Sequence, residues 1–77
     1  MIAAIYSTKL AQPELGRNNK WSAAFENWVD SDRGRYMSSS CSSAPVFDTA
    51  ADAEEGGKRA LAMLEATGKF PNMCEKF

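Results

Sequence analysis

The stretch from Thr49 to Gly68, TAADAEEGGKRALAMLEATG, decides how this chain can fold. Asp48 and Thr49 are both residues that cap helix N-termini well, and Asp52 follows Thr49 by three positions. Acidic residues fill the first turns, where they complement the helix dipole. Gly68 supplies a left-handed stop just before Phe70-Pro71. The pattern predicts a helix over residues 49–67.

One face of this helix is built from small residues. Positions three and four apart form a stripe of Ala50, Ala53, Gly57, Ala60, Leu61 and Leu64. Such a stripe lets the helix axis lie close to a flat β-sheet. Gly56 and Gly57 each cost about 1 kcal/mol relative to alanine inside a helix. Tight backbone packing or a kink at the glycines is therefore expected to offset that cost.

Upstream of the helix, the sequence indicates strands. Residues Ile2 to Leu10 mix β-branched and aromatic side chains and then break at Gln12-Pro13. The segment from Lys20 to Val29 fits one face of a strand or of a helix, and we interpret it as a strand. A polar turn from Asp30 to Arg35 then leads into Tyr36-Met37, where a third strand begins.

The serine tract that follows, Ser38 to Ser43, has too little apolar surface for the centre of a sheet. We expect an edge strand there, or a mobile lead into Pro45-Val46-Phe47. The pieces together predict a single α+β domain over residues 1–77, with the order β-β-β-α. Three antiparallel strands form the sheet, the helix packs across one face, and a C-terminal tail of residues 70–77 folds back.

A domain of 77 residues lies near the margin of stability. The free energy gained by burying apolar surface, at roughly 25 cal/mol per Å², barely exceeds the free energy lost with conformational entropy, which is about 1.5 kcal/mol per ordered residue. Nearly every large apolar side chain is therefore expected to be used in the core. The candidates are Trp21, Phe25, Trp28, Phe47, Leu61, Leu64 and Phe70.

Charge and composition narrow the function classes. Nine basic and ten acidic residues give a formal charge of -1. The protein therefore has no strong positive potential that would attract nucleic-acid phosphates or anionic lipid. The same balance disfavours mimicry of DNA. The first six residues lack a basic region and are too short for a signal peptide or membrane span, which predicts a cytoplasmic protein. Cys41 and Cys74 lack the nearby ligands of a zinc site, and we expect two free thiols.

No pattern in the sequence indicates chemistry. The chain has no histidine, no Ser-x-x-Lys and no Gly-x-Ser-x-Gly elbow, so its serines lack an activating base. Asp30-x-Asp32 begins like a calcium loop, but Arg33 and Arg35 occupy positions where the loop needs other residues. A phosphate-binding loop places its glycines before a helix, whereas Gly56-Gly57 lies inside the predicted helix. We therefore predict no catalytic residue, no cofactor and no metal.

Residues typical of protein interfaces are concentrated between Trp21 and Tyr36, which span two Trp, one Phe, one Tyr and two Arg. In a strand, Trp28 would face away from Phe25 and Val29, and it would lie at the surface or beneath the tail. We hypothesise a partner-binding surface made of Trp28, Asp30, Asp32, Arg33, Arg35 and Tyr36.

Two resemblances bear on function. The run from Gly57 to Leu64, GKRALAML, resembles the closing helix of double-stranded RNA-binding domains, but acidic residues stand where that family places its phosphate-binding lysines. In size, charge balance and lack of catalytic groups, the chain resembles the small proteins that phages use against bacterial hosts, including anti-CRISPR proteins. That resemblance implies stoichiometric inhibition in the host cytoplasm, with a host nuclease or CRISPR effector complex as partner.

The leading hypothesis is a non-enzymatic inhibitor or adaptor that binds a larger bacterial protein or nucleic-acid-guided complex. Direct contact with nucleic acid is disfavoured, and a small RNA-binding module is the first alternative. The second alternative is a structural protein that self-associates through the Ser38 to Ser43 edge, and we expect a monomer or a weak dimer.

Overall fold

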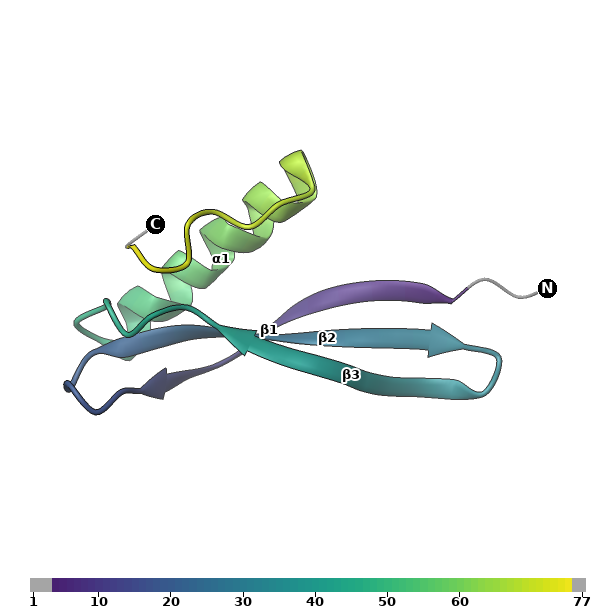
Figure 1. The fold of residues 1–77 in the computed structure, drawn as a ribbon, viewed down its shortest axis with the longest axis horizontal. Helices are drawn as coiled ribbons and strands as arrows, with labels where there is room; N and C mark the ends of the chain where they lie inside the picture. Colours follow the sequence, from purple (N-terminus) through teal and green to yellow (C-terminus); the bar gives the residue numbers. More distant parts are fainter. Residues whose placement is uncertain (1–3, 76–77) are drawn as a thin grey trace.

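The computed structural model describes residues 4–75 and contains one antiparallel sheet and one helix (Figure 1). The strands are β1 (Ile5–Leu15), β2 (Trp21–Ser31) and β3 (Gly34–Ser42), and they lie in the order β1-β2-β3. The helix is α1 (Ala50–Thr67). The predicted β-β-β-α fold is confirmed, as is the strand over the ambiguous segment before Val29. Ile2, Ala3, Lys76 and Phe77, which belonged to the predicted first strand and tail, lie outside the described residues.

The ends of α1 are fixed by its caps. The backbone N–H of Asp52 donates a 3.1 Å hydrogen bond to the Thr49 hydroxyl oxygen. At the other end, Gly68 has φ 78°, and its N–H donates to the Leu64 carbonyl at 2.7 Å. The predicted helix bounds are therefore confirmed to within one residue, because both signals are local in the sequence.

The predicted end of the first strand at Gln12-Pro13 is wrong, since β1 continues to Leu15. The pairing register of β1 with β2 shifts between Ala11 and Glu14, which marks an irregularity at the proline. Pro13 has no backbone N–H to donate. Because β1 is an edge strand, it can hold a proline without the loss of a hydrogen bond between central strands. The irregularity lets the strand pass the proline and pair again.

The helix lies very close to the sheet at Gly57. A Cβ atom at this position would collide with Leu10 of β1 and would lie 3.5 Å from the Ala23 Cβ of β2. The helix runs without interruption from Ala50 to Thr67. Close packing against Leu10 of the sheet therefore accounts for the glycine at position 57.

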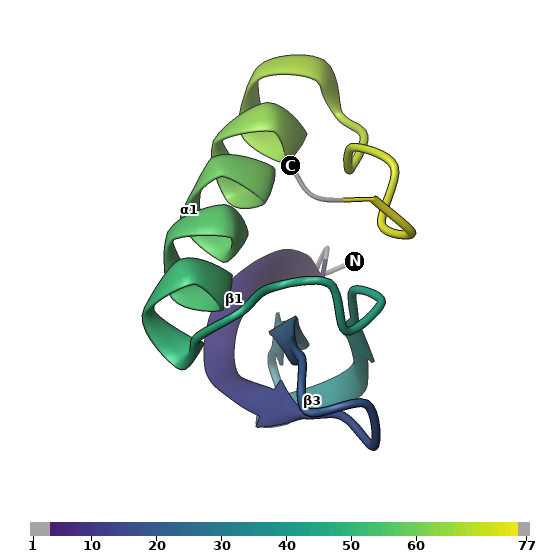
Figure 2. The ribbon, with the colours of Figure 1, turned by 90° about the vertical axis from the view of Figure 1, so that its left-hand side faces the viewer.

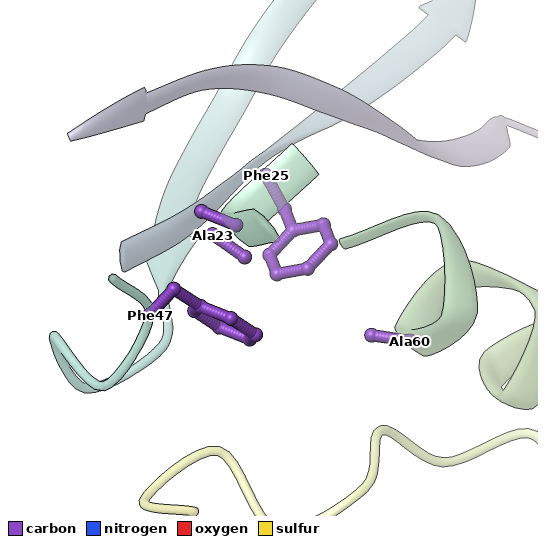
Figure 3. Close-up of a cluster of buried hydrophobic side chains, with 5 residues drawn as sticks. Ala23, Phe25, Phe47 and Ala60 are labelled. Carbon is purple, nitrogen blue, oxygen red and sulfur yellow. The ribbon is translucent and has the colours of Figure 1, made fainter. Parts of the chain in front are cut away.

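The core lies between the sheet and the first half of α1, where Phe25, Phe47 and small residues point toward one another (Figure 3). Phe47 pairs with Trp21 through two backbone hydrogen bonds, at 2.6 and 3.0 Å. The segment after α1 runs back toward the sheet (Figure 2), where Phe70 packs on Phe25 with ring centres 5.0 Å apart. The Met73 carbonyl accepts a bond from Ala44 N–H at 2.8 Å.

The expectation that nearly every large apolar side chain enters the core is confirmed only in part. Of the seven candidates, Phe25 and Phe47 are fully buried, and Trp21, Leu61 and Phe70 are half-buried and pack against the core. Trp28 and Leu64 are half-buried as well. Alanines at 23, 53 and 60 complete the core. The reason is geometric, because the sheet continues well past the end of α1 in Figure 1 and so carries side chains that the helix does not cover. The large apolar residues left exposed are Ile5, Tyr6, Leu15, Tyr36, Met37 and Met63. Within residues 4–75, no helix is both long and apolar enough to cross a membrane.

Candidate functional site

The end of the β2–β3 hairpin projects beyond α1, and we call its residues 26–37 the distal hairpin (Figure 1). Asp32 and Arg33 form its two-residue turn, and Gly34 has φ 117°, a backbone conformation that favours glycine. The Ser31 hydroxyl accepts a bond from Arg33 N–H at 3.3 Å and donates to the Gly34 carbonyl at 3.2 Å. The turn is therefore closed by its own hydrogen bonds.

The two faces of the distal hairpin differ. Phe25 points toward α1, so strand alternation places Val29 on that same helix face and Trp28 on the opposite, open face. The predicted orientation of Trp28, away from Phe25 and Val29, is confirmed. Phe70 of the tail packs on Phe25 and therefore lies on the helix face.

On the open face, Trp28 lies between two cations. The Lys9 ammonium is 6.0 Å from the ring centre, and the Arg35 guanidinium carbon is 5.3 Å from it. The indole N–H donates to the Glu26 carboxylate at 3.2 Å. Arg35 in turn lies 3.5 Å from the Asp30 carboxylate. The half-buried ring is thus held by one hydrogen bond and two cation–π contacts, with charges of both signs around it.

On the helix face, two exposed tyrosines flank a buried valine. Tyr6 of β1 and Tyr36 of β3 are both register partners of Val29 in β2. Tyr6 is 76% exposed and Tyr36 is 55% exposed, whereas Val29 is 3% exposed. The cross-strand tyrosines therefore form a row of aromatic surface beyond the helix.

The structure brings all six predicted binding residues to the distal hairpin but divides them. Trp28, Asp30 and Arg35 share the open face, and Tyr36 lies on the helix face. Asp32 and Arg33 are exposed at the turn between the faces. Sequence reasoning missed Lys9, because its position beside Trp28 depends on how β1 pairs with β2. It also missed Glu26, although alternation along β2 alone places residues 26 and 28 on the same face. Only the alternation of each strand, and not the register between strands, can be read from the sequence.

A second feature is an open hollow of about 460 Å³ between the second half of α1 and the sheet. Leu61 and Leu64 are half-buried there, and Thr8 donates a 2.9 Å bond to the side-chain carbonyl of Asn27. The residues around the hollow are Tyr6, Ser7, Thr8, Asn27, Trp28, Leu61, Leu64 and Glu65. Across the part of the chain that the structure describes, no buried side-chain polar atom lacks a partner, and no cluster of His, Cys, Asp and Glu could hold a metal. The hollow therefore shows no built polar site.

Cys41 and Cys74 are both free, as predicted, and the structure shows that both are exposed. Comparisons of the chain with protein-family models, curated proteins and solved structures found no match.

Proposed function

We propose that this chain is a non-enzymatic protein-binding domain that acts as a stoichiometric inhibitor or adaptor. Its partner is a larger bacterial protein or a nucleic-acid-guided complex, as the resemblance to phage anti-CRISPR proteins implies. The observation that carries the proposal is the position of Trp28 in the distal hairpin, where its ring lies between Lys9 and Arg35. Tryptophan and arginine are the residues that most often dominate the energy of protein interfaces.

The distal hairpin is suited to binding because its side chains are already positioned. Trp28 is held by Glu26 and by the two cations, and the hairpin turn is closed by the Ser31 hydroxyl. A surface ordered before contact loses less conformational entropy on binding than a mobile loop. The exposed tyrosines on the helix face add aromatic area at the same end of the molecule.

The charge pattern favours a protein partner over nucleic acid. An aromatic ring between two cations resembles a platform on which a base could stack. However, the Glu26 carboxylate accepts the indole N–H and Asp30 lies beside Arg35, so negative charge is close to any phosphate bound there. A mixed pattern of this kind matches a specific complementary patch on another protein.

Charge reversal at the distal hairpin tests the proposal. The tagged chain is used to isolate partners from the bacterial host, and each partner is then purified and titrated. Arg33→Glu with Arg35→Glu is expected to weaken binding at least tenfold, which corresponds to about 1.4 kcal/mol. Arg17→Glu is the matched control, because Arg17 is exposed in the β1–β2 turn at the other end of the sheet. The proposal is wrong if the double variant retains every partner at unchanged affinity.

Salt distinguishes the two binding classes. Labelled single-stranded and double-stranded oligonucleotides are titrated with the chain at low and moderate salt. Binding through phosphates weakens steeply over this range because counterions are released, whereas an aromatic protein interface is much less sensitive. Tight, salt-dependent oligonucleotide binding that Trp28→Ala removes would assign the open face to nucleic acid instead.

A further inference from the structure

The outer edge of β3 is unpaired within residues 4–75. β3 pairs with β2 on one side, and α1 packs on β1 and β2 but not on β3 in the described part of the chain. Every residue of β3, from Gly34 to Ser42, is exposed. A strand edge of this kind presents backbone N–H and C=O groups that another strand can bind.

The direction of these groups follows from one hydrogen bond. Ser43 N–H donates to the Ala23 carbonyl at 2.8 Å, so the backbone of residue 43 faces β2. Because bonded and non-bonded pairs alternate in an antiparallel ladder, residues 41 and 39 face β2 as well. The backbone groups of Ser40 and Ser42 consequently point outward. The register irregularity between Asn27 and Trp28 lies on the hairpin side of residue 39, so residues 39–42 form a regular edge.

The two edges of the sheet are protected to different degrees. The β1 edge carries Pro13, a register irregularity, Lys9 and Glu14, all features that discourage pairing with another chain. Along β3, residues 36–42 contain no charge and no proline. The β3 edge is therefore the one that remains competent to accept a strand.

We propose that two copies of this chain pair antiparallel through residues 39–42 of their β3 edges, forming a continuous six-stranded sheet about a two-fold axis. A second copy fits because the two identical edges are uncharged and bring no like charges together. In such a pair, the outward groups of Ser40 in one copy meet those of Ser40 or Ser42 in the other. The pairing is reciprocal, as a two-fold interface requires.

The size of the contact predicts a weak dimer. Stable protein interfaces bury about 1,200–2,000 Å² in total, and a regular edge of four residues with mostly serine side chains supplies much less. Self-association is therefore expected at high micromolar to millimolar concentration. This pairing leaves Trp28 on the open face uncovered, so the inference does not depend on the function proposed above.

Cys41 reports on the pairing directly. Its neighbours Ser40 and Ser42 carry the outward groups, so the two Cys41 residues lie directly opposite each other or are displaced by two positions. The corresponding separations between the two Cβ atoms are roughly 5 Å and roughly 7–8 Å. Both lie within reach of a short bismaleimide crosslinker, and the exposed thiol is available to it.

The experiment combines crosslinking with sedimentation over a wide concentration range. With Cys74→Ser, the Cys41 thiol alone is expected to give a covalent dimer whose yield rises with protein concentration. With Cys41→Ser, the remaining Cys74 thiol is expected to give several-fold less dimer. Sedimentation of the full chain is expected to show reversible monomer and dimer.

Two variants test whether β3 is the edge used. Ser40→Pro removes an outward N–H and leaves the β2 ladder intact, so the monomer is expected to keep its circular dichroism spectrum while dimer yield falls at least tenfold. Ser40→Lys with Ser42→Lys brings lysines of the two copies together and is expected to have the same effect if the proline variant fails to fold. A monomer at every concentration, a dimer that resists both variants, or Cys41 that crosslinks only to another protein would overturn the proposal.

Discussion

Gly57 of α1 lies directly against the side chain of Leu10 in β1, so closely that a Cβ atom on residue 57 would collide with the Leu10 Cδ1. The same Cβ would make only an ordinary contact, 3.5 Å, with Ala23. Glycine costs about 1 kcal/mol relative to alanine in a helix interior. The close approach of helix and sheet offsets that cost, because it allows Leu10 to pack across the helix backbone.

The first prediction is that Gly57→Ala and Leu10→Ala are coupled. In the natural background, the added methyl group displaces the end of Leu10, and the gain in helix propensity is cancelled. In the Leu10→Ala background the space is free, so Gly57→Ala should be more favourable by about 1 kcal/mol. A double-mutant cycle measured by urea unfolding checks this. Ala62→Gly, on the exposed side of α1, is the control and should cost the same in both backgrounds. Additive effects at 57 and 10 would contradict the packing argument.

The second prediction concerns the small core. Phe25→Ala removes a fully buried ring that also packs on Phe70, and such truncations cost about 3–5 kcal/mol. A domain of this size is stabilised by only roughly 4–12 kcal/mol, so the variant should lose a large share of its stability. Tyr36→Ala, at an exposed position on the neighbouring strand, should cost less than about 1 kcal/mol. Thermal unfolding followed by circular dichroism distinguishes the two, and equal losses would mean that the hairpin is part of the core.

The third prediction concerns the start of α1. Thr49→Ala removes the acceptor for Asp52 N–H and should lower the free energy of unfolding by about 1 kcal/mol. Thr49→Ser keeps a hydroxyl oxygen in the same place and should recover most of that loss. Chemical denaturation of the three proteins measures the effect. A serine variant as unstable as the alanine variant would show that the methyl group, and not the cap, matters.

The caps also show which parts of the fold the sequence can predict. Thr49 and Gly68 act within one turn of their own positions, so the helix bounds could be predicted to within one residue. The end of β1 could not be predicted, because Pro13 is tolerated only where the strand lies at an edge. Which strand becomes an edge depends on pairing with residues far along the chain.

The candidate site divides in the same way. Alternation along β2 correctly placed Trp28 opposite Phe25 and Val29, since alternation is a property of one strand. The same alternation places Glu26 beside Trp28, whereas the position of Lys9 depends on the register of β1 against β2, which local patterns do not fix. The expected large core is confirmed only in part for a related reason, because an 18-residue helix cannot cover strands that extend beyond its end.

The last prediction separates the binding surface from the stability of the fold. The Arg35 and Asp30 side chains are each 46% exposed, so their ion pair is screened by solvent and contributes at most about 1 kcal/mol. The contact of Arg35 with the Trp28 ring adds a similar small amount. Arg35→Met should therefore lower the free energy of unfolding by less than about 2 kcal/mol. In a Trp21→Phe background, where Trp28 is the only tryptophan, the same change should shift the emission of Trp28.

Lys9→Met is the matched control, because the Lys9 ammonium lies 6.0 Å from the ring centre, against 5.3 Å for Arg35. The lysine variant should therefore shift the emission less. Urea unfolding and tryptophan fluorescence of the two variants provide both measurements. If Arg35→Met destabilised the chain as strongly as Phe25→Ala, the open face would be holding the sheet together. The charges around Trp28 would then serve the fold and would not be available to a partner.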